Sequence, residues 1–150
     1  MFLRVVHTIL FCASFLLAHP YDFHTPQKSV QAYYKAINSA DISLLQAVMT
    51  PDSFDTEIKI YALSIALNDK SFYQQFKLYN KSSDAKQSII QKVKEKLEQR
   101  TARSIKIDKV IQLGTDRVMV KFYEDGKKKQ LYLSRHNDAW IIDYLAGRKR

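Results

Sequence analysis

The last third of the chain constrains the fold most strongly, because it consists of four short runs of apolar residues separated by turn signals. In the first run apolar and polar residues alternate, which is typical of a strand with one buried face. The Asp125-Gly126 pair between the second and third runs predicts a tight hairpin, since both residues tolerate positive φ. The sequence therefore predicts an antiparallel meander of four strands. The residues expected on its inner face are Ile105, Ile107, Ile111, Leu113, Val118, Val120, Phe122, Leu131, Leu133, Trp140, Ile142 and Tyr144.

The chain ahead of these strands is dominated by helical spacing of apolar residues. Thr25 followed by Pro26 is typical of a helix start, with a hydroxyl cap and a proline in the first turn. Apolar residues at i, i+3, i+4 and i+7 then predict a helix over residues 26–39 with one buried face. Asp41 can cap a second, short helix that ends before Pro51.

The middle of the chain also predicts helices. Residues 54–67 are apolar on nearly every side, which favours a buried helix, with a strand at residues 58–63 as the alternative. Aromatic residues continue at helical spacing over residues 72–79. A polar break then leads into the longest predicted helix, at residues 84–100. We therefore expect an α+β domain in which N-terminal helices pack on an antiparallel C-terminal sheet.

The N-terminus has the layout of an export signal. Arg4 precedes the apolar run of residues 5–17, and the small residue Ala18 stands at its end. The alternative is an uncleaved anchor, because residues 2–18 nearly reach the roughly 17 residues that a thin membrane span needs. The sequence thus predicts a periplasmic or secreted protein, with a domain anchored in the inner membrane and facing the periplasm as the alternative.

The 150 residues are enough for one domain with one core. The predicted organisation is a signal peptide at residues 1–18, a leader at 19–24, a single α+β domain at 25–146 and a basic tail at 147–150.

Composition sets aside several chemistries. The only cysteine, Cys12, lies inside the predicted signal peptide, so the mature chain would have no disulfide, thiolate metal site or cysteine nucleophile. The sequence has no Cys/His cluster with zinc spacing and no glycine-rich phosphate loop. We therefore expect no metal and no cofactor.

The chain is basic, with a formal net charge of +9 at pH 7. Such a surface favours anionic neighbours. The densest charge runs, residues 127–129 and 148–150, are expected to form a solvated turn and a frayed terminus. Weak contact with an anionic membrane surface is the alternative, because such runs add about 1 kcal/mol per residue near anionic lipid. No nucleic acid is expected, because the export signal removes the protein from it and the lysines are not gathered on one recognition helix.

Several short segments carry a resemblance to a known superfamily. They are Ile37-Asn38-Ser39-Ala40-Asp41 at the end of the first helix, Thr50-Pro51-Asp52 after the second, Asp125-Gly126 in the hairpin and Ala139-Trp140-Ile141-Ile142-Asp143 in the last strand. With this pattern the chain resembles the nuclear transport factor 2-like superfamily over about residues 25–144. More narrowly, it is similar to small exported bacterial members of unknown function, described as lumazine-binding-like. The chain departs from the pattern by its extra helix between residues 54 and 100 and by Ala40, where glycine is usual.

The resemblance implies a curved sheet wrapped by helices into a cystatin-like cone with an apolar mouth. In that superfamily the cone serves isomerases, cyclases and dehydratases as well as non-catalytic binding and assembly modules, so the fold does not choose among them. An enzyme of the ketosteroid isomerase kind would need a carboxylate base in an apolar pocket opposite a tyrosine or a protonated acid. None of the available groups stands at a matching motif position. These groups are Tyr33, Tyr34, Tyr61, Asp55, Glu57 and Asp143.

We therefore expect an exported module without catalytic residues that binds a small hydrophobic ligand or an envelope protein, as a monomer or a homodimer. A cofactor-free isomerase or dehydratase acting on a small hydrophobic substrate is one alternative, and a structural component of an envelope or secretion assembly is the other. The residues expected to line the ligand pocket are Tyr33, Tyr34, Ile37, Tyr61, Phe122 and Trp140.

Overall fold

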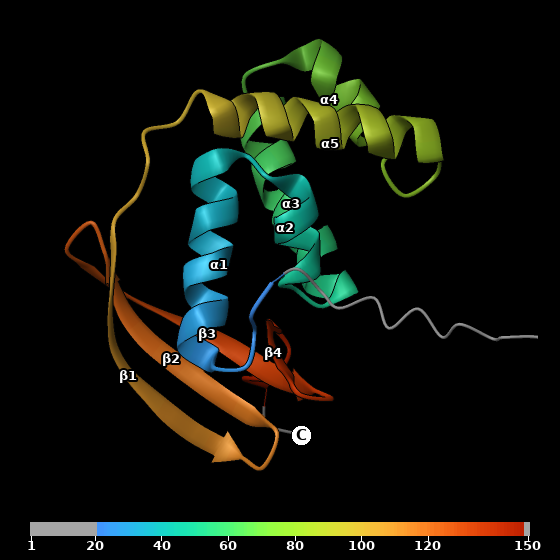
Figure 1. Ribbon diagram of the computed structural model, residues 1–150. Helices are drawn as coiled ribbons and strands as arrows, with labels where there is room; N and C mark the ends of the chain where they lie inside the picture. Colours follow the sequence, from blue (N-terminus) through green and yellow to red (C-terminus); the bar gives the residue numbers. More distant parts are fainter. Residues whose placement is uncertain (1–20, 149–150) are drawn as a thin grey trace, which may run out of the picture.

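A computed structural model describes residues 21–148 as five helices followed by a four-stranded sheet (Figure 1). The helices are α1 (Pro26–Ser39), α2 (Ile42–Ala47), α3 (Pro51–Ala66), α4 (Lys70–Phe76) and α5 (Ser83–Glu98). The strands are β1 (Ile105–Gly114), β2 (Arg117–Glu124), β3 (Lys127–His136) and β4 (Ala139–Ile142). The predicted α+β class is confirmed, whereas the predicted signal peptide lies outside the described residues. No helix within residues 21–148 is long and apolar enough to cross a membrane.

Side-chain caps explain where the helices begin. Each helix of the described part follows a side chain whose oxygen accepts a hydrogen bond from the backbone N–H three residues later. These caps are Thr25, Asp41, Thr50, Asp69 and Ser82. A cap of this kind stabilises a helix by roughly 0.5–2 kcal/mol. The predicted helix over residues 26–39 is confirmed, and the alternative strand at residues 58–63 is wrong, because these residues lie inside α3.

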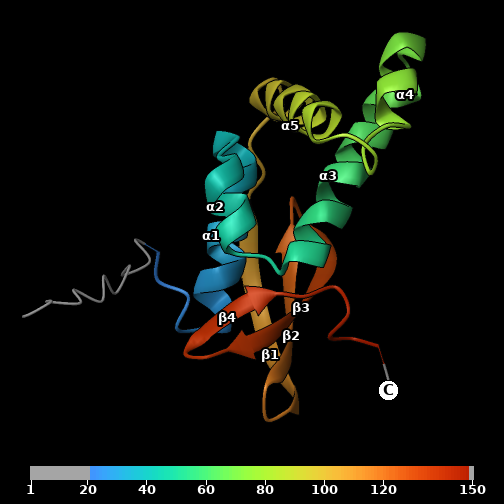
Figure 2. The same cartoon turned by 90° about the vertical axis from the view of Figure 1, so that its right-hand side faces the viewer.

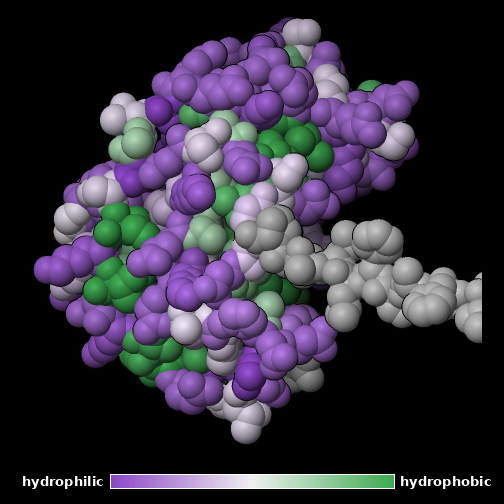
Figure 3. All heavy atoms as spheres, in the orientation of Figure 1, coloured by the Kyte–Doolittle hydropathy of each residue, from purple (hydrophilic) through white to green (hydrophobic). Residues whose placement is uncertain are grey.

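The helices form two layers above the curved sheet. α1 lies along the sheet, where it contacts β1, β2 and β4, and its C-terminal end meets α2 (Figure 1). α3 leads away from the sheet towards α4, and α5 crosses above and contacts α1, α3 and α4 (Figure 2). The surface over α5 is mainly hydrophilic, while hydrophobic side chains gather along the β1 edge of the sheet (Figure 3). The extra helical segment between residues 54 and 100 therefore adds a second helical layer to the domain.

The strands form one antiparallel meander in the order β1-β2-β3-β4. Its inner face and the helices share one core of apolar side chains, as the alternation of β2 and β3 predicts. The fully buried members of this core include Val30, Leu44, Leu45, Ile58, Ile89, Val93, Val118, Val120, Leu133 and Ile142.

A β-bulge in β1 changes which residues face the core. The pairing of β1 with β2 skips Asp108, so that Ile107 lies opposite Phe122 while Lys109 lies opposite Lys121. An extra residue in one strand reverses the alternation beyond it, because successive side chains point to opposite faces. Val110 therefore joins the core. The prediction that Ile111 and Leu113 face inward is wrong: Ile111 lies opposite Met119 on the outer face, and Leu113 is 39% exposed.

The free edge of β4 is closed by the loop between α2 and α3. The Ile142 N–H donates to the Val48 carbonyl at 2.8 Å, and the Thr50 N–H donates to the Ile142 carbonyl at 2.9 Å. Trp140 is held by its backbone, whose N–H donates to the Phe23 carbonyl at 2.8 Å. Its indole packs against the core but stays half-buried, so Trp140 closes the core only in part.

Candidate functional site

One carboxylate is buried between the helices and the end of the sheet. Glu57, on α3, is only 6% exposed and is the one charged residue among the buried residues of the described part. The Tyr33 hydroxyl of α1 donates to Glu57 Oε1 at 2.6 Å, and the Tyr144 hydroxyl donates to Glu57 Oε2. We call these three residues the Glu57 cluster. Both oxygens of its carboxylate accept a hydrogen bond from a phenol.

A second polar pair lies farther along the inner face of the sheet. Glu124 Oε1 accepts from the Tyr34 hydroxyl at 3.0 Å and from Arg103 Nη1 at 2.7 Å. The two neighbouring rings of α1, Tyr33 and Tyr34, meet edge to face with centroids 5.1 Å apart, and Tyr34 meets Phe122 in the same way at 5.5 Å. A row of phenols with two partner carboxylates therefore fills the space between α1, α3 and the sheet.

The phenols of this row are held in their neutral form. Burial raises the pKa of Tyr33 well above its usual value, and the charge of Glu57 adds to the effect. Burial, with Glu57 again adding, raises the pKa of Tyr61 to about 12 and that of Tyr144 further. Burial and the hydrogen bond to Glu124 raise the pKa of Tyr34. At neutral pH these hydroxyls therefore act as hydrogen-bond donors.

The structure brings five of the six residues expected to line a pocket into the buried core. They are Tyr33, Tyr34, Ile37, Tyr61 and Phe122, while Trp140 is half-buried at the core's edge. One open surface cleft of the described part touches Phe122, and four others touch none of the six residues. Their role in holding a ligand stays a prediction.

The remaining candidate carboxylates are at the surface. Asp55 accepts from Lys59 at 2.6 Å and from Lys86 at 3.0 Å, which ties α3 to α5. Burial opposes the charged form of Asp55, but the hydrogen bonds outweigh it and lower the pKa of Asp55 to about 2. Asp143 Oδ1 accepts from the backbone N–H of Leu145 in the turn after β4. Both carboxylates therefore have a structural role.

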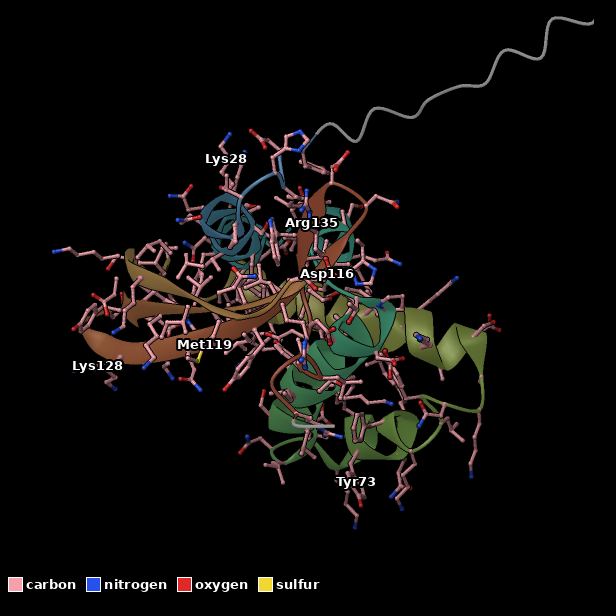
Figure 4. The ribbon with its side chains drawn as sticks, turned by 90° about the horizontal axis from the view of Figure 1, so that it is seen from below. Lys28, Tyr73, Asp116, Met119, Lys128 and Arg135 are labelled. Carbon is pink, nitrogen blue, oxygen red and sulfur yellow. The ribbon has the colours of Figure 1, made fainter. Side chains whose placement is uncertain are left out.

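The face of the sheet that points away from the helices, here called the outer face, has its own layer of side chains. Its apolar members are half-buried without belonging to the main core. Figure 4 shows Met119 and Lys128 on this side of the sheet, opposite α1. The residues of the outer face include Lys106, Lys109, Ile111, Arg117, Met119, Lys121, Tyr123, Lys128, Gln130, Tyr132 and Ser134.

Part of the outer face is covered by the segment that follows β4. The Asp143 N–H donates to the Tyr132 carbonyl at 2.9 Å, and Arg117 Nη1 donates to the Ala146 carbonyl at 3.4 Å. A Cβ atom at Gly147 would lie 2.7 Å from the ring of Tyr132, so only glycine allows this approach. The first residue of the predicted basic tail, Gly147, thus packs against Tyr132 on one half of the outer face.

An open cleft of about 380 Å³ lies on the other half of the outer face. Lys109, Lys121 and Lys128 line it, together with Tyr123 and Gln130. The bulge that re-aims Lys109 carries no glycine or proline, so the sequence analysis missed this grouping. The only signal was the Val110-Ile111 doublet, which interrupts strict alternation.

Among residues 21–148, no group of three or more His, Cys, Asp or Glu side chains is arranged to hold a metal ion. Comparison of the chain with protein-family models, curated proteins and solved structures finds no match.

Proposed function

We propose that this domain is an exported binding module without catalytic activity, built as a nuclear transport factor 2-like cone, and that its outer face is the binding surface. The observation that carries the proposal is the second layer of side chains on that face. Ile111 and Met119 lie opposite each other there, and Tyr123 follows four residues along β2, all half-buried and on the side of the sheet that no helix covers. An antiparallel sheet with one solvated face normally places polar residues on it. Apolar patches rimmed by polar residues are typical of interaction sites.

The charges of the outer face indicate the kind of partner. Lys106, Lys109, Lys121 and Lys128 all point to this side, and none of them forms an ion pair with a described residue. Two carboxylates line the clefts beside these lysines, Asp108 at the bulge and Asp125 in the hairpin. A surface with this excess of positive charge attracts an acidic partner and repels a second copy of itself.

The Glu57 cluster fits a structural role in this proposal. Each carboxylate oxygen of Glu57 accepts a hydrogen bond from a phenol, and Glu57 is only 6% exposed. Buried polar groups that satisfy one another in this way specify how elements pack. Here they join α1, α3 and the segment after β4.

Acylation of lysines tests the proposed surface without knowledge of the partner. The protein would be labelled in its own envelope fraction and again after purification, and each lysine would be quantified by mass spectrometry. We expect Lys106, Lys109, Lys121 and Lys128 to be protected several-fold in the envelope fraction. Lys70 and Lys81, which are exposed on the far helical layer, are the reference. Equal labelling of the two sets in the envelope fraction would show that the outer face is not the binding surface.

A second candidate function is proton transfer at Glu57. It is favoured by one observation, a buried carboxylate between phenols whose pKa is raised, which supplies a base and neutral hydrogen-bond donors in one place. This function needs a ligand to reach Glu57. A small phenolic probe such as 2-naphthol should then shift the ring resonances of Tyr33 and Tyr144, and Glu57→Gln should abolish the shift. If saturating probe leaves both rings unchanged, the catalytic candidate fails.

A further inference from the structure

Three lysines from three adjacent strands meet at the cleft of the outer face. Lys109 of β1 lies directly opposite Lys121 of β2. Lys128 of β3 lies opposite Tyr123, which is two residues along β2 from Lys121 and on the same face. Direct and diagonal cross-strand neighbours are close enough for their side chains to interact. The three ammonium groups therefore share one small region of surface.

This arrangement is unfavourable in the free protein. Like charges directly opposite each other on two strands destabilise a sheet. Lys129, the next residue along β3, points to the other face and lies 3.8 Å from Glu124, whereas none of the three outer lysines forms an ion pair with a described residue. Asp108 lines the same cleft but forms an ion pair with none of them. The region keeps an excess of two positive charges.

The bulge creates the arrangement. If Asp108 were paired like the other residues of β1, strict alternation would point Lys109 to the core and Val110 to the outer face. Bulges occur next to binding and active sites, where they re-aim a side chain. The bulge thus brings a third lysine beside two others, while the cleft holds one carboxylate, Asp108, that pairs with none of them. This excess of positive charge points to an anion from outside the protein.

We infer that Lys109, Lys121 and Lys128 bind the phosphate headgroups of an anionic phospholipid surface, with Ile111, Met119 and Tyr123 against the interface beside them. The inference deepens the proposed function and rests on it, because the outer face must be the binding surface. Lysine binds phosphate as a compact point charge. Tyrosine and apolar side chains next to cations suit the boundary between headgroups and acyl chains.

The outer face is less suited to a single-stranded nucleic acid, which is also an anionic partner. Such chains bind on rows of aromatic rings on which successive bases stack. Gly147 packs against the ring of Tyr132. Tyr132 lies opposite Met119, whereas Tyr123 lies opposite Lys128, so the two rings of the outer face are not neighbours and form no row. The lysines lie beside apolar side chains and not beside a row of aromatic rings. This arrangement favours a lipid surface over a single-stranded nucleic acid.

Vesicle binding tests the inference with the protein purified from its own envelope. The probes are vesicles of phosphatidylglycerol mixed with phosphatidylcholine, and vesicles of phosphatidylcholine alone. Each lysine near an anionic surface contributes about 1 kcal/mol, or about 5-fold in affinity. The double variant Lys109→Met/Lys121→Met should therefore bind the anionic vesicles about 25-fold more weakly. The matched control Lys70→Met/Lys81→Met loses the same net charge from the helical layer and should stay within about 2-fold of wild type.

The outcomes separate the sources of binding. An equal loss in both double variants, or equal binding to both kinds of vesicle by wild type, would overturn the lysine site. A single-stranded oligonucleotide that competes fully with the vesicles and is itself lost in the outer-face variant would overturn the lipid assignment. Circular dichroism checks folding, and relief of the charge repulsion should leave the melting temperature of the outer-face variant unchanged or higher. Lysine protection in the envelope without vesicle binding would leave the proposed function standing and refute this site alone.

Discussion

Glu57→Ala is expected to destabilise the domain by about 2–5 kcal/mol, because it removes the acceptor of two buried phenols. Leaving a buried donor without a partner costs about 1–3 kcal/mol, and the lost packing of the side chain adds to this. The Tyr33 and Tyr144 hydroxyls both donate to this carboxylate, and Glu57 itself is 6% exposed. Since a single domain has only about 5–15 kcal/mol of stability, the variant should unfold at a much lower urea concentration than wild type.

Two further variants distinguish the hydrogen bonds from the volume of the side chain. Glu57→Gln keeps the shape and one acceptor oxygen, so it should lose clearly less stability than Glu57→Ala. Asp55→Ala, on the same helix, removes a carboxylate that pairs with Lys59 and Lys86 at the surface, and exposed pairs contribute about 0–1 kcal/mol. If Glu57→Ala were as stable as wild type, the cluster would not hold the fold together, and the catalytic candidate would gain weight.

The helices could be predicted because their signals are local. Each helix begins after a capping oxygen and continues with apolar residues at helical spacing. Both signals lie within a few residues of the helix that they predict, so they can be found without knowledge of the tertiary structure. The end of α1 shows the limit of this reasoning. Ala40 adopts the left-handed conformation with φ 52°, although glycine is the usual residue for it. Its burial at 2% exposure indicates that packing of the methyl group offsets the strain.

The outer face could not be predicted because one extra residue decides it. Strict alternation in β1 places Ile111 inside, but the bulge at Asp108 exchanges Val110 for Ile111 and turns Lys109 outward. In the doublet Val110-Ile111 either residue could face the core, and only the pairing with β2 determines which one does. The strand could therefore be predicted from the sequence, and the lysine cleft could not.

The Glu57 cluster was missed for a different reason, which is sequence distance. Glu57 lies on the same face of α3 as Phe54, Ile58 and Tyr61, so a carboxylate within an apolar face was a visible signal. Its partners are 24 and 87 residues away along the chain. Tyr144 reaches Glu57 because β4 is held against the loop after α2 by backbone hydrogen bonds, and local patterns do not encode this contact.

Raising the pH above about 10 is expected to unfold the domain, because its buried tyrosines resist ionisation. The folded-state pKa is raised for Tyr33, Tyr34, Tyr61 and Tyr144, and for Tyr61 it reaches about 12. Below the unfolded-state pKa of about 10, both states keep the phenol proton and the stability contribution is complete. Above it, the unfolded chain releases protons that the folded chain retains, so the free energy of unfolding falls with rising pH until the folded-state pKa is passed.

Urea unfolding at a series of pH values between about 8 and 12 measures this loss, and the ultraviolet absorbance of phenolate reports how many of the nine tyrosines titrate in the folded state. Lysines also lose protons in this range, so the decisive comparison is with a variant. Tyr33→Phe/Tyr144→Phe should show a shallower decline of stability with pH than wild type. In the control Tyr73→Phe, the replaced residue is 41% exposed, so the free energy of unfolding should fall with pH as it does in wild type. If all nine tyrosines ionised near pH 10 with no loss of stability, the buried row of phenols between α1, α3 and the sheet would not exist.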